Sequence, residues 1–204
     1  MKSKKKIVVF ASGSGTNFIN IYENTDNATV VLLISNNSKC GAIEYAKNNN
    51  VNYKVINKIR YPNSLYDEYE KTLDYYKPDL ILLAGFMKKI PNNVINKFKN
   101  KIMNIHPSLL PKYGGKGFYG MKVHEAVINS KDKITGATIH FINNEYDRGP
   151  IIKQKEILVD FKNDNAISLA KKVLRVEYEL YLEIVKLYCN DKIYIENEKV
   201  VINE

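Results

Sequence analysis

The chain has 204 residues, of which 45% are hydrophobic, and a formal net charge of +9 at pH 7. That length suits one well-buried domain, so we expect a single domain over residues 1–204. No apolar run approaches the roughly 20 residues of a membrane span, and the apolar stretch after the N-terminal lysines is too short for a signal peptide. The sequence therefore predicts a cytoplasmic protein with no membrane association.

The positive charge has two possible uses. A nucleic-acid surface is one, but only three of the 31 basic residues are arginine, the side chain that forks onto phosphates and guanines. The lysines are also scattered along the chain, so attraction of an anionic small molecule is the more economical use. We expect small-molecule substrates and no nucleic-acid partner.

The cysteines and histidines argue against a metal or redox centre. Cys40 and Cys189 are far apart and fit no metal or redox spacing, so we expect both to be reduced and structural. The three histidines show no metal-like pairing. The sequence predicts no bound metal.

The first half of the chain alternates short apolar runs with amphipathic stretches. The apolar runs predict strands at 6–11, 29–35, 51–56, 79–85 and 101–106. The stretches between them predict helices near 17–24, 39–49, 64–77 and 91–99. Repeated strand–helix units of this length predict an α/β fold with a doubly wound, mostly parallel, Rossmann-like sheet.

The second half has a different pattern. Residues 135–142 and 150–159 alternate polar and apolar side chains and lie close together, which predicts an added antiparallel strand pair. A long C-terminal helix is expected near 165–189, and residues 192–202 predict a closing hairpin.

Three loops should carry the chemistry, because ligands of open α/β sheets bind beyond the carboxyl ends of the strands. They are "ASGSGTN" (11–17), "AGFMKK" (84–89) and "NIHPSLLP" (104–111).

The first of these loops leaves a strand and opens a helix. Gly13 and Gly15 allow a tight turn, and the N–H groups of Gly15, Thr16 and Asn17 would face an anion. The loop does not match the dinucleotide fingerprint, because Phe18 stands where a third glycine would fall. An ordinary turn with a Thr or Asn cap is the alternative. We favour the phosphate of a mononucleotide-like substrate.

The third loop pairs an amide with an imidazole. Asn104 and His106 would share one face of a strand that Pro107 ends, which predicts a catalytic pair. His140, among apolar residues on a strand, predicts a structural or supporting role. His124 is expected at the surface or in a loop.

Two further stretches remain open. Asp147 is either a turn residue ahead of Gly149 or a carboxylate delivered to the histidine. Residues 114–120 contain four glycines, and they form either a mobile lid or a tight loop that faces the substrate.

Glu177 interrupts an apolar stripe on the last predicted helix. The stripe consists of Ala170, Val173, Leu174, Tyr181 and Ile184. A carboxylate within such a stripe needs a partner, which is either a lysine or a ligand whose hydroxyl groups donate hydrogen bonds to it.

Several of these motifs occur together in one known family. "SGSGTN", "LAGFM", "NIHPSLLP", "GATIHF", "DRGP" and "RVEYELY" follow in its order and approximate spacing. Over essentially its whole length, the chain resembles the phosphoribosylglycinamide formyltransferase family. The resemblance implies transfer of a formyl group from 10-formyltetrahydrofolate, the co-substrate, to the amine of 5-phosphoribosylglycinamide in purine biosynthesis, by a monomer or homodimer that needs no metal.

The resemblance also assigns residues. The implied catalytic residues are Asn104, His106 and Asp147. The implied binding residues for the phosphoribosyl substrate are Gly13, Ser14, Gly15, Thr16, Asn17 and Glu177. The implied folate-binding residues are Met87, Lys88, Lys89, Ile90, Asn104 and Asp147. The chain departs from the family at Lys88, where arginine is frequent, at Arg148, where glycine is frequent, and near Asn63, where some members place a phosphate-binding arginine.

Three rival functions share part of this pattern. Methionyl-tRNA formyltransferase resembles the chain around "NIHPSLLP" but normally adds a C-terminal RNA-binding domain. Hydrolytic deformylation of formyl folate uses similar residues, usually in a longer chain. A basic α/β binding module would leave Asn104, His106 and Glu177 without a purpose.

Overall fold

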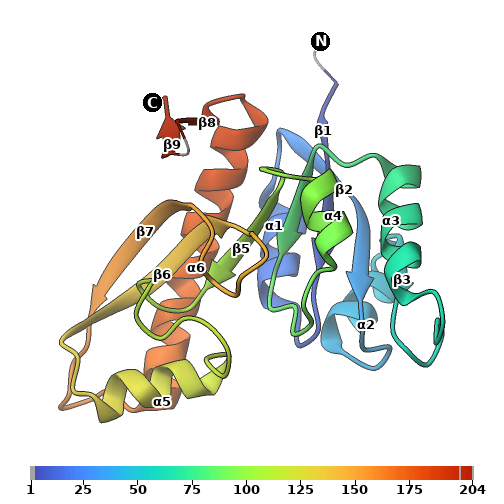
Figure 1. Cartoon of the computed structure of the whole chain (residues 1–204). Coiled ribbons are helices and arrows are strands. Elements are labelled where there is room, and N and C mark those ends of the chain that lie inside the picture. Colours follow the sequence, from blue (N-terminus) through green and yellow to red (C-terminus); the bar gives the residue numbers. More distant parts are fainter. Residues whose placement is uncertain (1–2, 198, 204) are drawn as a thin grey trace. The chain divides into compact units, whose positions relative to one another are not determined.

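The computed structural model describes residues 3–197 and 199–203 and is shown in Figure 1. The strand order is β3-β2-β1-β4-β5-β6-β7 in one sheet and β8-β9 in another. The chain forms two compact units, residues 1–103 and 104–204, and the strand β5 (Ile102–His106) passes from the first unit into the second. The single domain expected over the whole chain stays a prediction.

The first unit contains the parallel part of the sheet. Its strands are β1 (Lys5–Phe10), β2 (Ala28–Ser35), β3 (Tyr53–Val55) and β4 (Leu80–Leu83). β1 pairs in parallel with β2 and with β4, and β2 pairs in parallel with β3. All four residues of β4 are buried, as expected for an apolar run that is covered on both faces.

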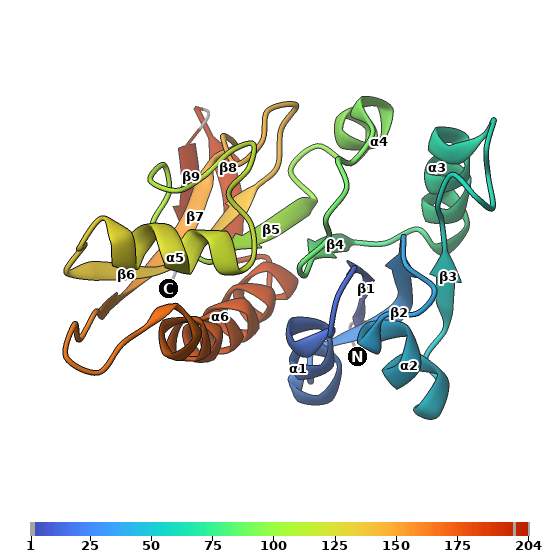
Figure 2. The same ribbon diagram turned by 90° about the horizontal axis from the view of Figure 1, so that it is seen from below.

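The helices of the first unit cover both faces of these strands. They are α1 (Thr16–Asn24), α2 (Gly41–Asn48), α3 (Leu65–Tyr76) and α4 (Asn92–Lys97). Figure 2 shows α1 and α2 on one side of β1 and β2, with α3 on the other side. This arrangement confirms the predicted doubly wound α/β class.

The second unit contains the antiparallel pair. Its elements are α5 (Met121–Asn129), β6 (Ile134–Phe141), β7 (Ile151–Leu158), α6 (Ala166–Cys189), β8 (Ile193–Glu196) and β9 (Lys199–Ile202). β6 and β7 pair antiparallel, and so do β8 and β9 of the predicted closing hairpin, whose residue 198 lies outside the described residues. Contrary to the predicted alternation, β6 is buried at every residue from 135 to 141, because α6 packs against the strand and the turn at 108–110 is hydrogen-bonded to its Thr138.

The long helix α6 begins at a capping box. The Asn165 Oδ1 atom accepts hydrogen bonds from the N–H groups of Ile167 and Ser168, and the Ser168 Oγ atom accepts one from the Asn165 N–H. The buried residues of this helix are Leu169, Val173, Val176, Glu177, Leu180, Tyr181, Ile184, Val185 and Cys189. Of the predicted stripe, Val173, Tyr181 and Ile184 are buried, and Ala170 and Leu174 are half-buried. The buried face of α6 is rotated slightly from the predicted stripe, toward Leu169 and Val176.

Two further expectations concern the whole chain. Cys40 and Cys189 are both buried and form no disulfide bond in the described residues, and their reduced, structural role stays a prediction. Among residues 3–197 and 199–203, no helix combines the length and the apolar character that crossing a bilayer requires.

Candidate functional site

The end of β5 presents the predicted pair in the second unit. His106 is buried and Asn104 is half-buried. The turn that follows is tied to β6 by Thr138, whose hydroxyl donates to the Ser108 carbonyl at 2.6 Å and accepts from the Leu110 N–H at 3.0 Å. These two hydrogen bonds fix the turn at residues 108–110 beside β6.

Asn104 contacts a histidine that the sequence had placed in a supporting role. Its Nδ2 atom lies 3.1 Å from Nε2 of His140, and Nδ1 of His140 lies 2.9 Å from the Phe141 carbonyl oxygen. A carbonyl only accepts, so Nδ1 donates to it, while Nε2 can accept from the Asn104 amide in the neutral ring or donate toward Asp147 in the protonated ring. The bond to the neutral ring sets which end of the Asn104 amide is the donor.

His106 has both ring nitrogens engaged. Nε2 donates to the Tyr113 carbonyl oxygen at 2.7 Å, and Nδ1 lies 3.6 Å from Oδ2 of Asp147. Burial lowers the pKa of His106, while the Asp147 charge and the Tyr113 hydrogen bond act to raise it. The ring is therefore held with Nδ1 as the nitrogen that faces the carboxylate.

Asp147 enters this group from the loop between β6 and β7. Its backbone has φ +54°, which is uncommon for a residue with a side chain. Its Oδ2 atom accepts the Gly115 N–H at 2.8 Å, and its Oδ1 atom lies 3.7 Å from Nε2 of His140. Burial acts to raise the pKa of Asp147, but His140, His106 and the Gly115 N–H together hold it below its usual range.

Gly149 allows the loop to return to the sheet after this aspartate. A Cβ atom at Gly149 would lie 1.8 Å from the Phe141 carbonyl oxygen, so no other residue fits without a shift of the backbone. The hypothesis that Asp147 is delivered toward the histidine agrees with this geometry. We call Asn104, His106, His140 and Asp147 the polar cluster.

His124 is not at the surface, and that prediction was wrong. It lies in α5 at 5% exposure, because the helix presents this side chain inward. Its Nδ1 atom has no hydrogen-bond partner among the described residues. Burial, with a smaller contribution from the charge of His106, lowers the pKa of His124 to about 4.

The polar cluster combines groups that can hold an anionic oxygen and move a proton. It offers an amide donor, two imidazoles and an ionised carboxylate within hydrogen-bond or ion-pair range of one another. The described residues contain no group of three or more His, Cys, Asp or Glu side chains that could hold a metal ion. The chemistry that the cluster itself supplies is acid–base and electrostatic.

The first unit holds the loop predicted to bind phosphate, residues 13–17, which we call the glycine loop. Gly15 precedes α1 with φ +81° and makes no side-chain cap, and no acidic residue lies in the first turn. The alternative of a side-chain cap on α1 is therefore not supported. Because a Cβ at Gly15 would lie 2.6 Å from the Ala42 Cβ, the loop needs glycine to pack against α2.

The predicted folate segment follows β4 in the same unit. The Ser12 hydroxyl accepts the Met87 N–H at 2.9 Å and donates to Asn36 Oδ1 at 2.5 Å, which ties the segment to the end of β1. Met87, Lys88 and Lys89 are exposed. Ile90 is buried, so its side chain belongs to the core and only its main chain is available to a ligand.

Glu177 lies in the second unit on α6. It is buried at 8% exposure among apolar neighbours of the same helix. The structure thus confirms the anomalous position inferred from the sequence. Its role as a ligand-binding residue stays a prediction.

Sequence reasoning missed the main-chain groups of Tyr113 and Gly115 that contact His106 and Asp147. Nothing in the residue types could have found them, because a carbonyl and an N–H belong to every position. The sequence predicts only a structural or supporting role for His140, whereas its ring contacts Asn104. The signal was available in its polar ring within the apolar run "ATIHFI".

Comparison with known proteins agrees with this fold. Residues 5–185 match the formyl transferase family model. The chain belongs to the formyl transferase family. The Rossmann-like class and the family predicted from the sequence motifs are both confirmed.

Individual relatives make the similarity more specific. The chloroplastic phosphoribosylglycinamide formyltransferase of Arabidopsis thaliana is 43% identical over 201 residues, an alignment that covers 93% of this chain and 67% of the relative. The protein of the same name from Vigna unguiculata is also 43% identical, over 93% of this chain and 62% of the relative. The chain thus spans about two thirds of the length of these plant proteins.

A solved structure is similar over nearly its full length. The crystal structure of phosphoribosylglycinamide formyltransferase from Anaplasma phagocytophilum superposes with a TM-score of 0.89 at 30% identity. The alignment covers 99% of this chain and 96% of that one.

Proposed function

We propose that this chain transfers a formyl group from 10-formyltetrahydrofolate to the amine of 5-phosphoribosylglycinamide, giving N-formylglycinamide ribonucleotide in purine biosynthesis. The observation that carries the proposal is the polar cluster, in which Asn104 and His106 share the end of β5 with Asp147 beside the imidazole. Membership of the family and the names of the relatives support the choice of substrates.

Asn104 and His106 stabilise the charge that develops in this reaction. The folate supplies an activated formyl group, and its oxygen becomes negative when the substrate amine attacks the formyl carbon. One N–H of the Asn104 amide is directed at His140, which leaves the other to donate to that oxygen. Protonated His106 can donate only through Nδ1, because Nε2 is held by Tyr113. Donors in such an oxyanion role contribute about 3 kcal/mol each.

Asp147 handles the proton. Its ionised carboxylate lies 3.6 Å from Nδ1 of His106 and favours the imidazolium. It also accepts the proton that the attacking amine must lose and returns it toward the leaving nitrogen, directly or through water. Its lowered pKa keeps it in the ionised form that this role needs.

Ligand binding is assigned to groups in both units. We propose that Gly13, Ser14, Gly15, Thr16 and Asn17 bind the substrate phosphate through main-chain N–H groups at the start of α1. Glu177 accepts hydrogen bonds from the ribose hydroxyl groups. Met87, Lys88, Lys89 and the main chain of Ile90 bind the folate, with Asn104 and Asp147 at its reactive end.

The remaining proposals concern the setting. We propose that the partners are these small molecules, that the protein is a monomer or homodimer, and that it works in the cytoplasm. Two buried cysteines without a disulfide bond fit a reducing compartment, and fractionation of the source cells checks the location.

The deciding experiment supplies 10-formyltetrahydrofolate with three acceptors in parallel. They are 5-phosphoribosylglycinamide, methionyl-tRNA and water alone. Formylation of the ribonucleotide, faster than the other two reactions by at least about 10²-fold, is the expected result. Formyl-methionyl-tRNA as the main product, or release of formate without an acceptor, would assign the chain to a rival function.

A further inference from the structure

Residues 113–115 touch two members of the polar cluster through their main chain. The Tyr113 carbonyl oxygen accepts from Nε2 of His106 at 2.7 Å, and the Gly115 N–H donates to Oδ2 of Asp147 at 2.8 Å. Three consecutive residues thus contact the imidazole at one end and the carboxylate at the other. Their conformation sets which nitrogen of His106 is free and where Asp147 lies.

This segment does not adopt its conformation by local preference. Tyr113 has φ +55° and Gly115 has φ +90°. A residue with a side chain rarely occupies that left-handed region without a fixed contact. A neighbouring group must therefore hold Tyr113.

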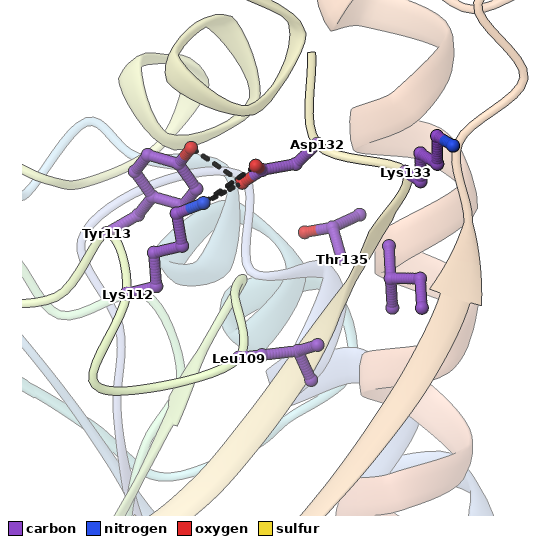
Figure 3. A pocket seen from close by; sticks show the side chains of 7 residues that line it. Leu109, Lys112, Tyr113, Asp132, Lys133 and Thr135 are labelled. Atoms are coloured by element: carbon purple, nitrogen blue, oxygen red, sulfur yellow. Dashed lines mark hydrogen bonds and ion pairs between the residues drawn. The ribbon is translucent and has the colours of Figure 1, made fainter. Parts of the chain in front are cut away.

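Asp132, two residues before the start of β6, is that contact. The Tyr113 hydroxyl donates to its Oδ2 atom at 2.7 Å, and the Lys112 Nζ atom donates to its Oδ1 atom at 2.6 Å. Figure 3 shows the Tyr113 ring and the Lys112 side chain both directed at Asp132, along one wall of a cavity of about 310 Å³. The Tyr113 ring also packs edge-on against Phe118, with 5.7 Å between the ring centroids.

The negative charge of Asp132 suits a residue that accepts hydrogen bonds from both Lys112 and Tyr113. Its hydrogen bonds from Lys112 and then from Tyr113 lower its pKa, so it accepts both bonds as a carboxylate across the neutral pH range. Asp132 itself touches no member of the polar cluster in the described contacts. Its influence would pass through Tyr113.

We propose that residues 113–115 form a main-chain clamp on His106 and Asp147, and that Tyr113 and Asp132 are positioning residues that hold this clamp in place. The inference deepens the function proposed above and rests on it for its effect on turnover. It also gives a task to the start of the glycine-rich stretch at 114–120. That stretch contacts the site through the Gly115 N–H, which donates to Asp147.

Release of the clamp has an effect that a loss of stability alone would not produce. The hydrogen bond to Tyr113 raises the pKa of His106, and the Gly115 N–H lowers the pKa of Asp147. Without the anchor, the pKa of His106 falls and the pKa of Asp147 rises. The other titratable groups facing this pair are His140 on β6 and His124 on α5, and every variant below leaves them in place.

The first test observes the ring itself and needs no substrate. The chain has three histidines, so nitrogen-15 NMR resolves each ring across a pH titration. In the wild-type protein the neutral His106 ring carries its proton on Nε2. Tyr113→Phe and Asp132→Ala should lower the His106 titration midpoint and introduce the Nδ1-protonated form. Asp132→Asn, which keeps an acceptor oxygen, should give a smaller change.

The matched control is Tyr45→Phe. The Tyr45 hydroxyl donates to Glu23 at 2.7 Å in the first unit, so this variant loses a bond of the same kind and length in the unit that does not contain the cluster. It should leave the His106 spectrum unchanged. An unchanged His106 spectrum in both Tyr113→Phe and Asp132→Ala, each folded by thermal unfolding, overturns the clamp whatever reaction the protein catalyses.

The second test measures turnover. Tyr113→Phe and Asp132→Ala should lower kcat by about tenfold with little change in either KM, since they act on the reacting groups and not on substrate binding. The bell-shaped pH profile of kcat should narrow from both sides. The reason is that the pKa of Asp147, which sets the acidic limb, rises while the pKa of His106, which sets the basic limb, falls. A profile that falls in height without narrowing means that the anchor is only structural. If the wild-type protein fails to formylate the ribonucleotide, the NMR result still decides the clamp.

Discussion

The glycine loop of the first unit and the polar cluster of the second are built in opposite ways. The loop takes its candidate binding groups from five consecutive residues, 13–17, and none of them carries a charge. The cluster takes its groups from β5, β6 and the loop between β6 and β7, with residues 104, 106, 140 and 147 drawn together. The loop works through main-chain N–H groups and the helix dipole. The cluster works through side chains whose ionisation depends on one another.

This difference predicts how each region responds to change. A main-chain site fails when its backbone cannot adopt the required turn, and it has no group to titrate. A side-chain site fails when one polar group is replaced, even though the fold survives. We therefore expect cluster variants to reduce kcat, and loop variants to affect stability or substrate KM.

The largest effect is expected in the cluster. Asp147→Asn and His106→Ala should each lower kcat by about 10²- to 10³-fold while the protein stays folded, because each removes a group that acts on the reacting atoms. Asparagine tolerates the positive φ of Asp147, so the backbone should be retained. Steady-state kinetics with circular dichroism provides the check. Near-normal turnover in either folded variant contradicts the assignment.

Two substitutions in the glycine loop should affect protein stability and substrate binding separately. Gly15→Val places a branched side chain at φ +81° and within 2.7 Å of the Ala42 backbone, so it should destabilise the protein by about 3 kcal/mol. A Cβ atom at Gly13 would have no other atom within 4 Å, so Gly13→Val should keep the fold. It should raise the KM for the phosphoribosyl substrate by about tenfold and leave the KM for the folate unchanged, since a side chain there obstructs an anion. Denaturant unfolding and steady-state kinetics test the pair, and equal losses for both substrates in Gly13→Val would contradict the phosphate assignment.

Part of the pH dependence of stability should come from His124, a buried residue of α5 in the second unit. The pKa of His124 is about 4 in the folded protein and about 6.5 when unfolded. The contribution of the neutral His124 ring to the free energy of unfolding is therefore fully present above pH 6.5. As the pH falls from 6.5 to 4, the free energy of unfolding decreases by up to about 3 kcal/mol. His124→Leu should remove this part of the pH dependence, and it should cost little at pH 7 because Nδ1 has no partner in the described part of the chain. Urea unfolding from pH 4 to 8 measures it, and parallel curves for the two proteins would exclude a neutral, buried His124.

The smallest effect is expected at Glu177. Glu177→Gln should raise the KM for the phosphoribosyl substrate by about tenfold, and the KM for the folate much less, since the amide keeps the shape but loses the negative charge. Substrate-dependent kinetics with a melting curve provides the test. A changed melting temperature with both KM values unaltered would show that Glu177 serves the core of α6 alone.

Local sequence determined most of the secondary structure and the glycine loop. Apolar runs of four to eight residues indicate buried strands, and Gly15 allows the turn that ends at α1. The pair at residues 104 and 106 also followed from sequence, because alternate residues of a strand share one face. The family motifs supported both features.

Only the tertiary structure decided the rest. His124 looked exposed because one helical residue does not reveal which side its helix presents, and the packing of α5 buries it. The contacts of Tyr113 with His106 and with Asp132 join residues that no sequence spacing connects. The ionisation of the cluster is likewise a property of the folded chain, because desolvation and charge pairing act only after distant side chains have been brought together.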